Sequence, residues 1–321
     1  MKNDIKVLPE VFLDRLRRIF PPAKFDEAAN TFAEPKPTTF RVNTLKADPA
    51  AVKEALEHAG FILQPVHGIP SAFSLKRGSL RDLQKEKVYR EGKIYVQSIP
   101  SMIPALVLDP RPGEEILDLT AAPGSKTTQI ACLMGNKGKI VANDNDRVRF
   151  FKLKANVEGQ GASIVELSLR YGEAFGKHRP ESFDRVLLDA PCSAEGRFLT
   201  GEPASYRYWK PAKVKEMVRK QKKLFFSAVH ALRTGGILVY STCTYAPEEN
   251  EGVLDWALKK FPAVLELEPV CLPFPNQMPG LGRWEKEEFD PRVRRAVRLI
   301  PTAEMEGFFV ARLRKKNPAA F

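Results

Sequence analysis

The chain has 321 residues, and at ~150 residues per domain this length predicts two domains. Hydrophobic residues make up 43% of the chain and charged residues 28%, which excludes a largely disordered protein and leaves enough apolar material for a core. Lysine and arginine total 51 against 39 acidic residues, so the net charge is +12. This excess favours a polyanionic partner, nucleic acid before an acidic membrane surface.

No apolar run approaches the ~18 residues that a membrane span needs. The first ten residues carry Asp4 and Glu10 in place of the apolar block of a secretory signal. Four cysteines without a Cys-x-x-Cys pair, and only four histidines, predict neither a disulfide framework nor a metal site. We therefore expect a cytoplasmic monomer with free thiols, no membrane partner and no metal.

The first 90 residues predict a small α+β domain. Helical apolar spacing covers residues 5–20 and 24–32, and strands are expected at 38–45, 61–66 and 72–75. Asp48 and Pro49 open a further helix, and Gly60 ends it. The basic stretch 76–93 is either a solvated connection, which its composition favours, or part of a binding face. We place the domain boundary after residue 90, so that residues 91–321 form the second domain.

From residue 114 onward, short apolar strands alternate with helices. The expected strands are 115–119, 139–142, 164–167, 183–188 and 236–241, and the expected helices are 126–134, 147–158, 212–232 and one that ends near residue 259. Repeated βα units predict an α/β fold with a doubly wound, mostly parallel sheet. In such a sheet the ligand site lies at the carboxyl ends of the strands.

A loop of small residues, 120–125, joins the first strand of this domain to its helix. Gly124 lets backbone N–H groups approach a ligand, but it stands alone, so both the P-loop and the G-x-G-x-x-G patterns fail. Asp144 follows the second strand, where a carboxylate can accept hydrogen bonds from both hydroxyls of a ribose. An adenosine ligand without a pyrophosphate clamp fits this pair, with S-adenosylmethionine first. A plain βα turn with a surface acid fits equally well.

Two cysteines follow successive strands of the predicted sheet. Cys192 lies in the loop after the fourth strand, three residues beyond Asp189, and Cys243 lies in the loop after the fifth. Both loops therefore open on the ligand side. Cys132 and Cys271 lack such a position and are interpreted as small buried hydrophobes.

An acid and a thiol at adjacent strand ends suit methylation at C5 of a pyrimidine. That carbon becomes nucleophilic only after a thiolate adds to C6, while an acid near N3 stabilises the developing charge and a base later removes the C5 proton. A free cysteine is only a few per cent thiolate at pH 7, and Lys126 and a cationic sulfonium are the positive charges available to change this. Methylation of an exocyclic amine would favour Asp-Pro-Pro with an aromatic, where this chain has Asp-Ala-Pro-Cys.

These motifs resemble those of the RNA cytosine-C5 methyltransferases of the NOL1/NOP2/Sun family, to which RsmB- and RsmF-like enzymes belong. The matching segments span most of the chain and are AAPGSKT (121–127), DAPCSAEG (189–196), STCTYAPEENE (241–251), RVNTLK (41–46), KIYVQSIPSM (93–102) and EGFFVARLRK (306–315). The resemblance implies a class I, Rossmann-like methyltransferase domain that uses S-adenosylmethionine. It also implies a small N-terminal domain that binds RNA, either ribosomal or transfer RNA.

The resemblance assigns roles to matching positions. It makes Cys243 the nucleophile that attacks C6 and lets Cys192 assist release of the product. Asp189 contacts N3 and lies near the methionine end of the cofactor, Lys126 lies beside these groups, and Asp144 holds the ribose. The loop that lines the cofactor comprises Thr120, Ala121, Ala122, Pro123, Gly124, Ser125 and Lys126.

The chain departs from the family pattern at two positions. Thr120 stands where the family usually has cysteine, and its similar size predicts that backbone binding survives. Where the family often has an acid near the adenine, this chain has Tyr171, with Glu173 two residues on. Tyr171 is therefore expected to stack on the adenine or bond to it, unless this contact is lost.

Two basic segments have two interpretations each. Residues 207–223 combine basic and aromatic side chains, which bind RNA phosphates and bases or form an amphipathic helix with a solvated face. The arginines at 292, 294, 295 and 298 have the same two interpretations. Two other functions compete with RNA methylation: a DNA cytosine-C5 methyltransferase, in which Cys192 would be the nucleophile, and an inactive RNA-binding or ribosome-assembly factor.

Overall fold

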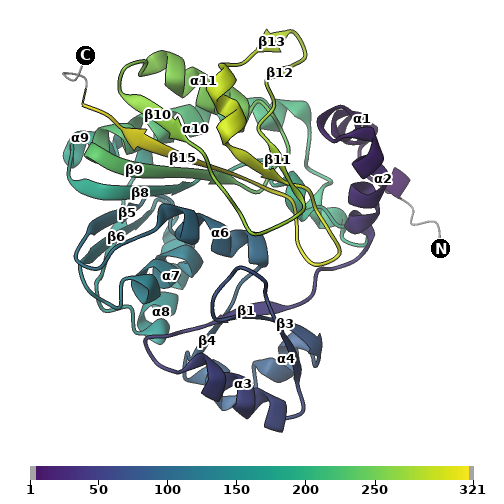
Figure 1. Cartoon of the computed structure of the whole chain (residues 1–321), viewed down its shortest axis with the longest axis vertical. Coiled ribbons are helices and arrows are strands. Elements are labelled where there is room, and N and C mark those ends of the chain that lie inside the picture. The colour runs from purple at the N-terminus through teal and green to yellow at the C-terminus, as the bar shows by residue number, and fades with distance from the viewer. Residues whose placement is uncertain (1–4, 318–321) are drawn as a thin grey trace.

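The computed structural model describes residues 5–317, so the outermost residues of both predicted domains, 1–4 and 318–321, lie outside it. A large mixed sheet forms the centre of the molecule, with strands in the order β11-β14-β15-β9-β8-β5-β6-β7 (Figure 1). Strands β5 to β9 run parallel, and β15 then pairs antiparallel with β9. The predicted α/β, doubly wound and mostly parallel architecture is confirmed.

The strands of this sheet are β5 (Glu115–Asp118), β6 (Lys139–Asp144), β7 (Val165–Leu169), β8 (Phe183–Asp189), β9 (Leu232–Thr242), β10 (Leu265–Glu268), β11 (Gln277–Pro279), β14 (Val297–Leu299) and β15 (Phe308–Lys315). The helices around it are α6 (Ile99–Leu108), α7 (Ser125–Leu133), α8 (Arg147–Gln160), α9 (Phe175–His178), α10 (Pro211–Ala231) and α11 (Glu251–Lys260). A short hairpin, β12 (Arg283–Trp284) with β13 (Glu287–Glu288), lies apart.

Apolar side chains cover both faces of the sheet, as buried parallel strands require. In β9, Leu238 and Tyr240 point to one face, where they join a core that includes α10 and α11. Ile237 and Val239 point to the other face, towards α6 and α7. The pairing of β9 with β8 sets the register of the two strands and with it the position of the loops at their ends.

A smaller antiparallel sheet, in the order β2-β3-β1-β4, lies at the lower end of the view in Figure 1. Its strands are β1 (Thr39–Val42), β2 (Ile62–Pro65), β3 (Ala72–Arg77) and β4 (Ile94–Val96), and its helices are α3 (Pro49–His58), α4 (Leu80–Leu83) and α5 (Lys87–Arg90). Asp48 caps α3 by accepting hydrogen bonds from the backbone of Ala50 and Ala51, as its sequence signals predict. The stretch 76–93 is no plain connection, because α4 and α5 form within it.

The first two helices, α1 (Glu10–Ile19) and α2 (Pro22–Asn30), do not pack on this small sheet. They lie against the large sheet's end of the molecule (Figure 1), where Phe12 contacts Phe198 and Trp209. Phe20 contacts Tyr245, two residues beyond Cys243. The N-terminal helices therefore pack beneath the loops that carry the cysteines.

Helix α6 and strand β4 are absent from the sequence-based prediction. Helix α6 contains Pro100 in its first turn and Pro104 inside it, and proline in a helix interior normally argues against a helix. Burial overrides this local signal, because α6 packs against α7, β8 and β9. None of the described helices is long and apolar enough to cross a membrane.

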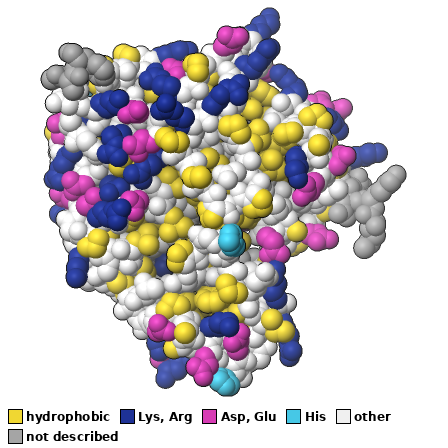
Figure 2. Space-filling view, viewed as in Figure 1, with side chains coloured by type: hydrophobic (Ala, Val, Ile, Leu, Met, Phe, Trp, Pro, Cys, Tyr) yellow, Lys and Arg dark blue, Asp and Glu magenta, His cyan; other side chains and the backbone are white. Residues whose placement is uncertain are grey.

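On the face seen in Figure 2, lysine and arginine side chains stand among acidic ones over β10 and β15 at the upper left. Ion pairs account for this mixture: Glu268 binds Arg312 and Arg314, and Glu266 binds Lys316. Because these cations already have acidic partners, we do not assign this part of the surface to RNA.

The arginines at 292, 294, 295 and 298 are predicted either to bind RNA or to form a solvated face, and Arg298 does neither. Arg298 is only 2% exposed, and its Nε lies 2.6 Å from Oε1 of Glu251. It also donates a hydrogen bond of 2.9 Å to the carbonyl of Tyr245. Arg298 is thus a structural residue that ties α11 to the loop after β9.

Replacing this buried arginine tests its structural role. We expect Arg298→Met to lower the free energy of unfolding by about 3–5 kcal/mol, because the carboxylate of Glu251 stays buried without its partner. Urea denaturation measures this change. The exposed Arg294→Met is the matched control and should stay within about 0.5 kcal/mol of the parent. A loss below about 1 kcal/mol in Arg298→Met would contradict the assignment.

Candidate active site

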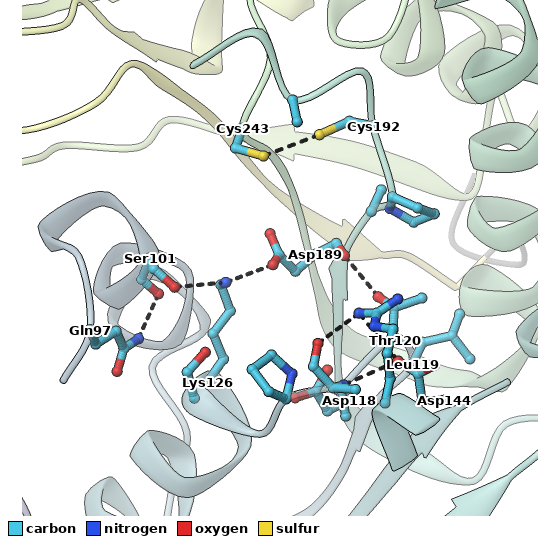
Figure 3. Close-up of a pocket in the computed structure, with 18 of the residues that line it drawn as sticks. Gln97, Ser101, Asp118, Leu119, Thr120, Lys126, Asp144, Asp189, Cys192 and Cys243 are labelled. Atoms are coloured by element: carbon cyan, nitrogen blue, oxygen red, sulfur yellow. Dashed lines mark hydrogen bonds and ion pairs between the residues drawn. The ribbon is translucent and has the colours of Figure 1, made fainter. Parts of the chain in front are cut away.

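The loops after β8 and β9 meet at one point. The two strands are parallel, and Asp189 pairs with Ser241 at their carboxyl ends. This register places Cys192 and Cys243 opposite each other, with their Sγ atoms 3.3 Å apart (Figure 3). A further bond, from the N–H of Gly196 to the carbonyl of Cys243, holds the loops together at 2.9 Å. The sequence-based prediction that both loops open on the same side is confirmed.

The two thiols have opposite pKa shifts. A hydrogen bond from Cys192 is the main cause that lowers the pKa of Cys243 to about 7; burial opposes it, and the positive charge of Arg197 adds to it. The same hydrogen bond, together with burial, raises the pKa of Cys192 well above its usual value. The opposite shifts make Cys243 the more acidic thiol of the pair.

Asp189 and Lys126 form an ion pair below the thiols. The Nζ of Lys126 lies 2.6 Å from Oδ2 of Asp189 and donates a second hydrogen bond, of 3.0 Å, to Oγ of Ser101 on α6. The hydroxyl of Ser241 donates to Oδ1 of Asp189 at 2.8 Å. The carboxylate is thus oriented on both sides but remains 31% exposed to the cavity.

A cavity of about 610 Å³ connects these groups with the loop after β5. In Figure 3 the cysteines lie at one end, Asp118, Thr120 and Asp144 lie at the other, and Asp189 lies between them. Asp144 is buried, and its Oδ2 accepts a hydrogen bond from the backbone of Ala122. The cavity lies inside the range of about 300–1,000 Å³ that is usual for small-molecule and cofactor sites.

The cofactor loop has the predicted position. Thr120, Ala121, Ala122, Pro123, Ser125 and Lys126 line the cavity. Gly124 does not line it but forms the turn into α7 with φ of 102°, and a side chain there would meet Leu153. At the floor, burial raises the pKa of Asp118 to about 7, and a hydrogen bond from Thr127 opposes this rise.

Tyr171 is not brought to the cavity. Its side chain is 73% exposed, whereas the next residues, Gly172 and Glu173, line the cavity wall. An adenine contact by Tyr171 would require its side chain to turn inward. Glu173, two residues beyond the position where the family pattern has an acid, is the carboxylate that lines this part of the cavity.

Several groups at the site were not singled out from the sequence. Arg197, five residues beyond Cys192, lines the cavity, and Cys243 is the main cause that raises its pKa. Glu249 lies in the quoted motif after Cys243; it accepts hydrogen bonds from the backbone of Ser193 and from Gln221, and burial raises its pKa to about 8. Both residues fall inside or just beyond recognised motifs, so a closer look at motif neighbours could have found them.

The other two cysteines do not have the predicted environment. Cys271 is exposed, because it lies in an irregular stretch between β10 and β11. Cys132 is half-buried, and its thiol donates to Oδ1 of Asn43 at 3.2 Å. The interpretation of both as buried hydrophobes is wrong, since neither residue faces an apolar core.

Residues 105–314 match the family described as 16S rRNA methyltransferase RsmB/F, and residues 8–99 match the N-terminal domain of 16S rRNA methyltransferase RsmF. The chain belongs to the RsmB/F methyltransferase family. The resemblance drawn from its motifs is confirmed, and so is the class I methyltransferase fold.

Relatives in this family are similar over nearly the whole chain. Ribosomal RNA small subunit methyltransferase F of Escherichia coli O127:H6 is 38% identical over 313 residues, which are 96% of this chain and 63% of that protein. The chain thus spans less than two thirds of the length of this relative. A crystal structure of a methyltransferase homologue from Pyrococcus horikoshii is 33% identical, with a TM-score of 0.79 over 97% of this chain and all of the other.

The hydrogen bond between the two thiols can be tested by alkylation. We expect iodoacetamide to modify Cys243 with a pH midpoint near 7, because the thiolate is the reactive form. Cys192→Ala removes the donor, so the midpoint should rise towards the ~8.5 of an ordinary cysteine. Mass spectrometry of digested protein measures modification at each site, with the exposed Cys271 as internal reference.

A donor at residue 192 is the critical feature, so Cys192→Ser should keep the midpoint of Cys243 closer to 7 than Cys192→Ala does. An identical midpoint in the parent and in Cys192→Ala would show that the contact does not set the pKa of Cys243.

Proposed function

We propose that the chain methylates C5 of a cytosine in RNA, with S-adenosylmethionine as the methyl donor and Cys243 as the nucleophile. The observation that carries this proposal is the pair of sulfur atoms 3.3 Å apart at one end of a cavity whose other end holds Asp144. The names of the relatives favour ribosomal RNA over transfer RNA.

The residues at the far end of the cavity fit the cofactor. Asp144 would hold the ribose hydroxyls, the backbone of 120–123 would line the cofactor, and Glu173 would lie near the adenine. Asp189 and Lys126 would lie by the methionine end. When bound, S-adenosylmethionine supplies an electrophilic methyl group, which forms a bond with C5.

The chain's own residues would supply the remaining chemistry. The thiolate of Cys243 adds to C6, and the electron pair of the broken C5–C6 π bond makes C5 nucleophilic. Lys126 would supply a proton through the Asp189 carboxylate to N3, which neutralises the negative charge that forms on the ring. After methylation a base takes the C5 proton, the C5–C6 double bond forms again, and the bond to Cys243 breaks.

Cys192 would act on this last step. When Cys243 is the thiolate, the S–H of Cys192 is the donor of the contact between the two sulfur atoms, and a donor that stabilises the thiolate also makes it a better leaving group. This explains why one hydrogen bond serves both the attack and the release of Cys243.

Cationic side chains at the cavity support an RNA substrate. Arg149, Lys152, Arg197 and Lys220 line it together with Lys126. Lys220 comes from α10, whose apolar residues Val214 and Leu224 are buried, so this helix contributes both to the core and to the cavity. Cations at the mouth of a cavity can bind the phosphates on either side of an extruded base.

Bisulfite sequencing of ribosomal and transfer RNA tests the proposal. We expect one or more cytosines to be protected in cells that carry the gene and to lose protection in cells without it. Cys243→Ala should abolish the protection, because C5 is then never activated. Cys271→Ala is the matched control, because it replaces an exposed cysteine outside the cavity. Expressed in cells without the gene, this variant should restore protection fully.

Each competing function predicts a different result. In a DNA cytosine-C5 methyltransferase Cys192 would be the nucleophile. Cys192→Ala would then abolish methyl transfer, while Cys243→Ala would still turn over. An assembly factor without methyltransferase activity would leave no methyl group in total RNA incubated with labelled cofactor.

A further inference from the structure

A second cavity, of about 250 Å³, adjoins the first. Arg197 and Glu306 line both cavities, and the remaining walls of the second come mainly from residues 31–36 and the turn after Cys192. The two cavities are neighbours because they share these two residues. A nucleotide next to a target base in the first cavity would therefore lie beside the second. The volume lies below the about 300 Å³ at which ordinary cofactor pockets begin, so it suits a single base.

Glu306 has an unused acceptor at the junction of the cavities. Its Oε2 is buried, and no hydrogen bond from the described residues reaches it. A buried carboxylate oxygen without a hydrogen-bond donor destabilises the folded chain. Oε2 has almost no exposed surface, so a ligand donor reaches it when the Glu306 side chain turns into the cavity.

The two cations of the second cavity, Arg197 and Lys36, interact electrostatically with Glu306 and still keep hydrogen-bond donors for a ligand. The guanidinium of Arg197 has no hydrogen bond or ion pair with the side chains and backbone of residues 5–317. Lys36 donates one hydrogen bond, of 2.6 Å, to the carbonyl of Thr31, which leaves two of its three donors unused. Phosphate oxygens are the acceptors that such cations bind in RNA.

We propose that the second cavity holds the nucleotide next to the target cytosine and that Glu306 selects guanine there. This inference rests on the proposed function. Guanine alone among the RNA bases presents two adjacent donors, N1–H and the N2 amine, which match the two oxygens of a carboxylate. Adenine and cytosine present one donor from their amine beside an acceptor, and uracil presents one N–H between two acceptors.

Apolar walls fit the rest of the base. Phe32, Phe198 and Pro301 give the second cavity apolar surface for the faces of a base. Its carboxylates are Glu34 and Glu306, and of the two only Glu306 also lines the first cavity. Arg197 and Lys36 would bind the flanking phosphates, which position the strand but do not read its sequence. Base selection is therefore assigned to Glu306, and affinity to the two cations.

The test uses transcripts of the RNA segment that bisulfite sequencing identifies, with each neighbour of the target cytosine replaced in turn by every base and by inosine. Inosine keeps N1–H but lacks the N2 amine. We expect guanine at one neighbouring position to give kcat/KM about tenfold above uracil, with inosine between them, as one good hydrogen-bonded pair provides. Glu306→Gln should reduce the guanine-to-uracil ratio to about twofold or less.

The ratio between two RNAs within one variant is unaffected by any general loss of folded or active protein. The matched control is Glu304→Gln, because Glu304 is exposed and pairs with Lys76 outside both cavities. It should keep the parent's ratio. Lys36→Met should raise KM for all transcripts alike and leave the ratio unchanged.

Methylation that proceeds with no preference for either neighbouring base would overturn the subsite and leave the proposed function intact. A guanine preference that survives in Glu306→Gln would likewise overturn the role of Glu306. Absence of methylation in every transcript and in cellular RNA would instead refute the proposed function, and the subsite with it.

Discussion

The contact between the sulfur atoms of Cys192 and Cys243 depends on the register of two parallel strands. Asp189 of β8 pairs with Ser241 of β9, and each strand leads into its cysteine loop within three residues. Apolar side chains on both faces of β9 hold the strand in this pairing, which runs without a shift from Arg185–Ile237 to Asp189–Ser241. The burial that stabilises the sheet therefore also sets the 3.3 Å separation of the thiols.

Buried polar groups then hold the two loops in place. Glu195 accepts hydrogen bonds from the backbone of Tyr245 and from Trp209, and burial raises its pKa. Glu249 binds the backbone next to Cys192 in the same way. Helix α1 packs on these loops through Phe12, which contacts Phe198. The N-terminal helix therefore contributes to the geometry of the site.

The sequence is sufficient to predict the parts of the site that follow strand ends. Cys243, Asp189 and the 120–126 loop lie together because parallel strands place their carboxyl ends on one edge, and short continuous apolar runs reveal those strands. Helix α6 could not be predicted, because tertiary burial overrides its prolines. The approach of Arg197 to the thiols depends on how a turn folds back onto β9, which local sequence patterns do not encode.

The central claim is that Cys243, and not Cys192, forms the transient bond to the cytosine ring. Mass spectrometry of Cys192→Ala protein incubated with substrate RNA and S-adenosylmethionine tests it most directly, since weaker leaving-group stabilisation should let the adduct accumulate. We expect a nucleotide mass attached to the peptide that contains Cys243. No adduct in Cys192→Ala, together with one on Cys192 when Cys243→Ala is used, would contradict it.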